Sequence, residues 1–135
     1  MKSLFYLILA SIVLLASCGK TGNPVWQKSG KNIFGKWTYT DYYLSTGGPG
    51  EWQQVKPANQ SIEFKTDGSF VATESFLKGA TTYQILDSTR IRFQPTSTTS
   101  GFTLMGYSVE KEGKELYLYP IDPICIEGCN NKFTR

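Results

Sequence analysis

The chain has 135 residues, of which 40% are apolar, 14% aromatic and 19% charged, a composition typical of one globular domain. Its formal net charge is +3, and the basic residues form no stripe of the kind that nucleic-acid-binding proteins carry. The sequence contains no histidine, which excludes Ser-His-Asp and Cys-His catalysis, His-ligated zinc and His-ligated haem. We therefore expect no nucleic-acid partner, no metal, no cofactor and no enzymatic activity.

The N-terminal residues are expected to form a targeting segment. Lys2 is the only charged residue before Lys20, and a nearly unbroken apolar run covers residues 4–16. The run is shorter than the roughly 20 residues that span a bilayer, and a basic start before a short apolar core is typical of a secretory signal. It ends in Leu15-Ala16-Ser17-Cys18, which resembles the lipobox of bacterial lipoproteins. The alternative is an ordinary cleaved signal followed by an incidental cysteine.

The lipobox resemblance implies a signal peptide over residues 1–17 and a lipid on Cys18, which begins a tether over residues 18–33. Several acyl chains hold a protein stably, so the membrane is a partner through the N-terminal lipid. Gly19 stands where inner-membrane lipoproteins of this kind carry aspartate, and no acidic surface-export cluster follows. We therefore expect an outer-membrane lipoprotein that faces the periplasm, with the cell surface as the alternative.

Residues 34–135 have the pattern of short β-strands. Apolar and polar residues alternate in several runs, as at Ile62 and Phe64, and turn signals such as Thr66-Asp67-Gly68 separate the runs. We expect an all-β fold, an eight-stranded antiparallel up-and-down barrel, because closure removes exposed strand edges; a two-sheet β-sandwich is the alternative. The expected strands are 34–44, 60–66, 69–76, 81–86, 89–94, 102–110, 114–120 and 131–135. Residues 44–60 are expected to form one long loop.

The first expected strand opens with Gly35-Lys36-Trp37, which resembles the Gly-x-Trp motif that begins strand A of lipocalins. The layout of residues 34–135 is similar to the small lipocalin-like lipoproteins of Bacteroidetes. The residues 64–70 (Phe-Lys-Thr-Asp-Gly-Ser-Phe) and the ending 125–129 (Cys-Ile-Glu-Gly-Cys) strengthen this likeness. It implies a lipocalin-like barrel whose first loop covers the open end and whose late arginine packs on the tryptophan. Arg135 or Lys132 is placed to do so.

The cysteines predict one disulfide bond. If Cys18 carries the lipid, Cys125 and Cys129 are the remaining pair, and an oxidising periplasm favours their bond. So small a loop contributes roughly 2 kcal/mol on the chain-entropy model. The alternative, a redox or zinc site, is disfavoured because the spacing is not Cys-x-x-Cys and no histidine is present.

The aromatic residues lead to two functional hypotheses. In the first, the barrel interior binds a small hydrophobic ligand; in the second, the barrel is filled and its loops bind a protein partner, as an inhibitor or interaction module. An eight-stranded barrel is just wide enough for either. Trp52 and Tyr43 flank the long first loop and are expected at the mouth. The candidate ligand-binding residues are Trp37, Tyr39, Tyr43, Trp52, Phe64, Phe70, Tyr83, Phe93 and Tyr107.

One further motif predicts a covalent modification. Asp87-Ser88-Thr89 resembles the acceptor motif for O-glycans in periplasmic proteins of Bacteroidetes, which makes Ser88 a candidate glycosylation site. The alternative is an ordinary turn, in which Asp and Ser are common residues.

Overall fold

A computed structural model describes residues 32–73, 76–94, 101 and 103–135 of the chain. The predicted signal peptide, Cys18 and almost all of the predicted tether lie outside the described residues. Within them, the fold is all-β with one short 3-10 turn, η2 (Lys111–Gly113). The strands are β1 (Gly35–Leu44), β2 (Glu51–Gln54), β3 (Ser61–Phe64), β4 (Phe70–Ala72), β5 (Thr82–Ile85), β6 (Arg90–Gln94), β7 (Leu104–Glu110), β8 (Glu115–Asp122) and β9 (Asn131–Thr134).

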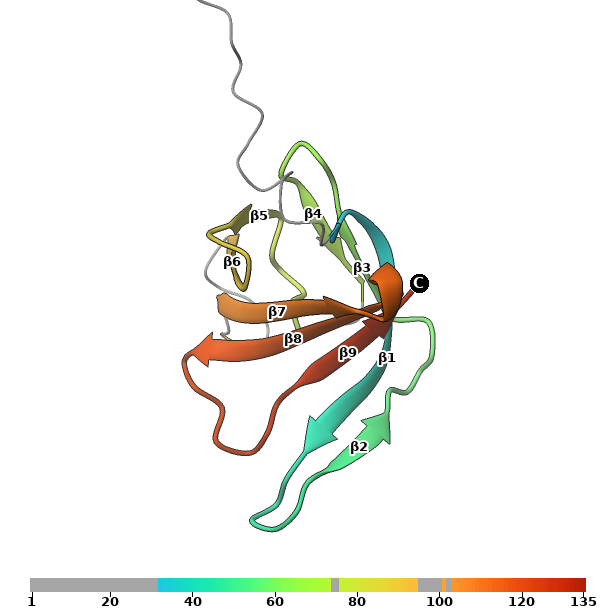
Figure 1. Cartoon of the computed structure of the whole chain (residues 1–135), viewed down its shortest axis with the longest axis vertical. Helices are drawn as coiled ribbons and strands as arrows, with labels where there is room; N and C mark the ends of the chain where they lie inside the picture. The colour runs from blue at the N-terminus through green and yellow to red at the C-terminus, as the bar shows by residue number, and fades with distance from the viewer. Residues whose placement is uncertain (1–31, 74–75, 95–100, 102) are drawn as a thin grey trace, which may run out of the picture.

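Eight of these strands form an antiparallel, nearly closed barrel (Figure 1). The neighbours follow the order β4-β3-β1-β9-β8-β7-β6-β5, and each pair is antiparallel. The barrel closes through a few backbone hydrogen bonds between the β4 and β5 segments. There the Phe70 amide donates to the Thr81 carbonyl at 2.8 Å, and the Tyr83 amide donates to the Gly68 carbonyl at 3.0 Å. The predicted barrel is confirmed, and the alternative sandwich is wrong.

The prediction of an unbroken loop over residues 44–60 is wrong, because this stretch contains β2. The strand folds back on β1, with Tyr43 opposite Trp52 and Asp41 opposite Gln54, and prolongs β1 into a hairpin that leaves the barrel (Figure 1). All four residues of β2 are exposed. The strand therefore forms through backbone pairing with β1 and not by burying one face, so apolar alternation could not reveal it.

The interior is filled by side chains from six strands and from the connections at both ends. Each of the largest core residues is at most 2% exposed, so protein atoms surround its side chain on almost every side. The barrel is therefore a packed core in the region that these residues occupy. They are Trp37, Phe64, Phe93, Phe133, Ile33, Ile62, Leu77, Ile91, Met105, Leu116 and Leu118.

One end of the barrel is sealed around Trp37. The Trp37 indole Nε1 donates to the Ile33 carbonyl at 2.7 Å, and the Arg135 guanidinium lies 4.2 Å from the centroid of the Trp37 ring. Arg135 also donates to the carbonyls of Gly113, Phe34 and Asn32, at 2.6, 2.9 and 3.2 Å. Of the two basic residues predicted to pack on the tryptophan, Arg135 does so. We call this the closed end.

The two ends of the barrel differ in their connections. Three tight turns, at residues 65–69, 86–89 and 111–114, lie toward the closed end, whereas the longer connections lie at the other end. One of these, between β4 and β5, inserts Phe76 and Leu77 into the barrel. The Phe76 ring lies 5.8 Å from the Tyr39 ring and 6.3 Å from the Phe133 ring. Leu77 is fully buried, so this connection fills the end opposite Trp37.

Candidate functional site at the rim of the barrel

Most of the predicted ligand-binding residues belong to the packed core. Phe64, Phe70 and Phe93 form a cluster with ring centroids 4.8–6.1 Å apart, and the half-buried Tyr83 ring meets Phe64 edge-on at 5.0 Å. The aromatic faces that a ligand would use already contact one another, which favours the hypothesis of a filled barrel. The predicted residues that are buried are Trp37, Tyr39, Phe64, Phe70, Phe93 and Tyr107.

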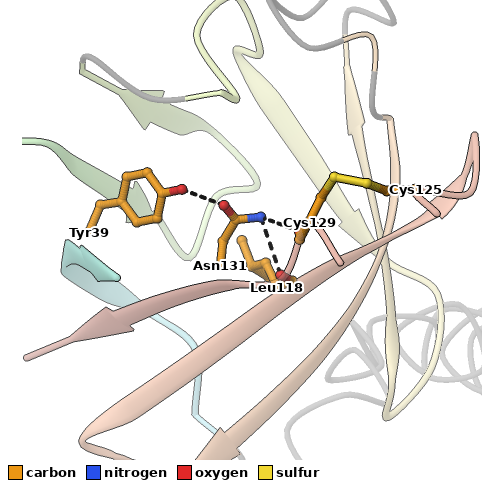
Figure 2. The surroundings of a disulfide bond; sticks show 5 residues. All are labelled: Tyr39, Leu118, Cys125, Cys129 and Asn131. Carbon is orange, nitrogen blue, oxygen red and sulfur yellow. Dashed lines mark hydrogen bonds between the residues drawn. A yellow bond between two sulfur atoms is a disulfide. The ribbon is translucent and has the colours of Figure 1, made fainter. Parts of the chain in front are cut away.

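A buried polar contact links the interior to the disulfide-closed loop after β8 (Figure 2). The Tyr39 hydroxyl donates to Asn131 Oδ1, and Asn131 Nδ2 donates to the carbonyls of Cys129 at 2.8 Å and Leu118 at 3.5 Å. Burial raises the pKa of Tyr39 far above its ordinary value, so its hydroxyl stays a proton donor. The contact therefore fixes where the loop leaves the barrel.

The loop itself carries the predicted disulfide. Cys125 and Cys129 are joined, with their Cα atoms 5.8 Å apart, which confirms the pairing. The loop is also bonded to the outer end of β1. The Tyr43 amide donates to the Asn130 carbonyl at 2.7 Å, and the Ser45 amide donates to the Glu127 carbonyl at 2.9 Å. The β1–β2 hairpin and this loop thus form one surface, seen at the same end of the molecule in Figure 1. We call residues 42–54 and 123–130 the rim.

Tyr43 holds the two parts of the rim together. Its ring is so close to Gly50 on one part and Gly128 on the other that a Cβ atom at either glycine would overlap it. Its ring centroid lies 5.4 Å from that of Trp52, which in turn lies 5.9 Å from that of Tyr117. Tyr117 stands between the buried residues of β8, so this aromatic row lies on the outer face. The structure therefore brings Tyr43 and Trp52 together at the rim, outside the barrel interior.

The rim gathers the exposed apolar side chains. Five of the seven large hydrophobic residues that are exposed in the described part of the chain lie on it: Tyr42, Leu44, Trp52, Ile124 and Ile126. Ile124 and Ile126 are 77% and 92% exposed, respectively. Apolar groups gathered on a fixed backbone are typical of interaction sites, because little ordering entropy is lost on binding. Sequence reasoning missed both isoleucines, although their position beside Cys125, in a loop too short to reach the core, was a usable signal.

The carboxylate of Glu115, on the outer face of β8, contacts three donor groups. Glu115 accepts hydrogen bonds from Lys111 Nζ at 2.8 Å, the Tyr117 hydroxyl at 2.9 Å and Lys132 Nζ. The bond from Lys111 is the largest cause that lowers the pKa of Glu115 to about 2. Because two ammonium groups and a hydroxyl already occupy this carboxylate, it stabilises the β8–β9 surface and offers no free acid for catalysis.

Ser88 lies in the tight turn between β5 and β6, toward the closed end. The Asp87 carboxylate accepts hydrogen bonds from the Thr89 amide at 2.9 Å and from the Arg90 side-chain Nε at 2.6 Å, and these bonds lower the pKa of Asp87 to about 2. It also accepts a bond from the Arg90 amide at 2.8 Å. The carboxylate therefore organises the turn, and Ser88 is left exposed at its tip. Glycosylation of Ser88 stays a prediction.

The chain matches no protein-family model and no curated protein. In the part of the chain that the structure describes, no group of acidic, cysteine or histidine side chains could hold a metal ion. No helix within the same residues is long and apolar enough to cross a membrane.

Proposed function

We propose that this protein is a lipid-anchored, lipocalin-like component of the bacterial envelope whose packed barrel is a scaffold and whose rim binds a protein partner. The observation that carries the proposal is the exposure of Ile124 and Ile126. Their loop is closed by a disulfide and hydrogen-bonded to Tyr43 and Ser45 at the outer end of β1, so its backbone is held in place while both side chains are exposed. Burial of each isoleucine by a partner would contribute about 1.5–3 kcal/mol.

The likeness to lipocalins is supported by the closed end. The resemblance implied an arginine on the tryptophan of the Gly-x-Trp motif, and Arg135 lies over Trp37 although 98 positions separate the two in sequence. The predicted order of strands around the barrel adds to this support.

The anchor predicted at Cys18 would orient the rim. Asn32 is held at the closed end by Arg135, and 13 residues lie between Cys18 and Asn32. A coil of that length has a root-mean-square end-to-end distance of about 20 Å. The ten residues of β1 alone extend about 33 Å from the closed end toward the rim. An anchored chain would therefore turn its closed end to the membrane and present the rim to proteins of the periplasm.

A small hydrophobic ligand inside the barrel is the second candidate function. One observation favours it: Phe76 and Leu77, which fill the end opposite Trp37, belong to the connection between β4 and β5 and not to a strand. A ligand that displaced these two side chains would stack on Tyr39 and Phe133, whose rings contact Phe76.

The experiment compares crosslinking in the native envelope of cells that carry the full chain or its variants. The double variant Ile124→Ser/Ile126→Ser should lose the crosslinked partner band and keep the thermal stability of the parent. The matched control is Val71→Ser on β4, because Val71 is 45% exposed but lies away from the rim. Retention of the partner by the double variant, or its equal loss in the Val71 control, would contradict the proposal.

A further inference from the structure

Strand β2 has a free backbone edge. It pairs with β1 on one side, and within the described residues no strand pairs with its other side. The Val55 amide donates to the Thr40 carbonyl at 2.9 Å. In an antiparallel pair, residues whose backbone groups bond to the neighbouring strand alternate with residues whose backbone groups point away from it. Gln53 therefore also bonds to β1, whereas the amides and carbonyls of Trp52 and Gln54 point away from β1.

This edge lacks most of the features with which proteins block strand edges. Lysine, proline and β-bulges commonly do so. The sequence Glu51-Trp52-Gln53-Gln54 contains neither lysine nor proline, and its register with β1 is unbroken. The hairpin is fixed to the disulfide-closed loop through Ser45 and Glu127, so its edge is held in an extended form before any partner arrives.

We propose that the free edge of β2 binds an extended segment of a partner protein as an added strand. This inference rests on the proposed function and names the form of partner that the rim recognises. Backbone hydrogen bonds to Trp52 and Gln54 would provide affinity. The outer-face Trp52 ring, 45% exposed, would select an apolar or aromatic residue on the same face of the segment. Glu51 and Gln53 face the opposite side, so the segment should alternate apolar with polar residues.

The size of the edge argues against a second copy of this chain as the occupant. Two β2 edges paired about a two-fold axis would join only four residues from each copy. A stable dimer buries about 1,200–2,000 Å² in total, which is more than two such short strands supply. A weak, transient complex with a segment of another protein does not need that area.

The test uses random twelve-residue peptides displayed on phage and selected on the full chain held in detergent micelles. Gln54→Pro removes the outward amide, and proline is tolerated there because β1 does not use that amide. We expect this variant to bind the selected peptides ~20-fold more weakly than the parent. The matched control, Gln54→Ala, keeps the amide and should bind within about threefold of the parent, since the side chain is not used. The selected peptides should alternate apolar and polar residues.

The outcomes also separate this inference from the proposed function. Peptides that tolerate Gln54→Pro but are lost in Ile124→Ser/Ile126→Ser would overturn the edge proposal and leave the rim as the binding surface. Self-association of the full chain that disappears in Gln54→Pro, measured by sedimentation, would identify a second copy as occupant and overturn it too. Failure to select any peptide would also overturn it.

Discussion

Replacement of Arg135 with alanine tests whether the closed end depends on one side chain. The guanidinium donates to three backbone carbonyls, at Gly113, Phe34 and Asn32, and stacks on Trp37. An exposed cation–π contact contributes about 0.5–1 kcal/mol, and each exposed hydrogen bond about 0.5 kcal/mol. Arg135→Ala should therefore lower the free energy of unfolding by about 2 kcal/mol, which corresponds to roughly 8–16 °C in Tm for a domain of this size.

The assay is urea denaturation followed by tryptophan fluorescence, with two controls. Arg135→Lys keeps a positive charge near Trp37 but loses the planar guanidinium that donates to several carbonyls. Its loss in free energy of unfolding should therefore be about half that of the alanine variant. Arg92→Ala, at an exposed position of β6, should change stability by less than about 0.5 kcal/mol. Equal stability of Arg135→Ala and the parent, or an equal loss in Arg92→Ala, would refute the role assigned to Arg135.

Three further predictions concern packing and titration. Gly106→Ala should destabilise the barrel by about 1–2 kcal/mol in urea, because the new Cβ would overlap the Tyr119 ring, and the cost should disappear in a Tyr119→Ala background. Tyr39→Phe should cost about 1–3 kcal/mol, because buried Asn131 Oδ1 loses its donor; a change below about 0.5 kcal/mol would contradict this. The pKa of Glu115 is lowered to about 2, so its stabilisation is complete above its ordinary value of 4.5 and is lost as the pH falls through 2. The stability difference between the parent and Glu115→Gln should therefore shrink over that range, and a constant difference would show that Glu115 does not titrate as proposed.

The barrel was predictable because its strands bury one face. Ile62 and Phe64, or Leu116 and Leu118, alternate with polar residues in the sequence and are buried in the structure. The disulfide was also predictable, because two cysteines remain once Cys18 is assigned to the lipid. The strands follow from a local alternation of apolar and polar residues, and the disulfide follows from the number of cysteines.

The rim was less predictable because it depends on contacts between distant segments. Strand β2 has no buried face, and its existence follows from pairing with β1. The position of Tyr43 depends on the absence of side chains at Gly50 and Gly128, which lie on different loops. Sequence identified Tyr43 and Trp52 as neighbours of a functional loop, but it could not show that they lie on the outer face.

Native mass spectrometry of the full chain, extracted in detergent from the cells that produce it, tests most directly whether the barrel interior is solid and the binding surface lies outside it. We expect a mass that equals the mature polypeptide, the predicted N-terminal lipid and any glycan on Ser88, together with a protein complex that dissociates in Ile124→Ser/Ile126→Ser. A small hydrophobic molecule that stays bound until the barrel unfolds, and that the rim substitutions do not release, would contradict this expectation.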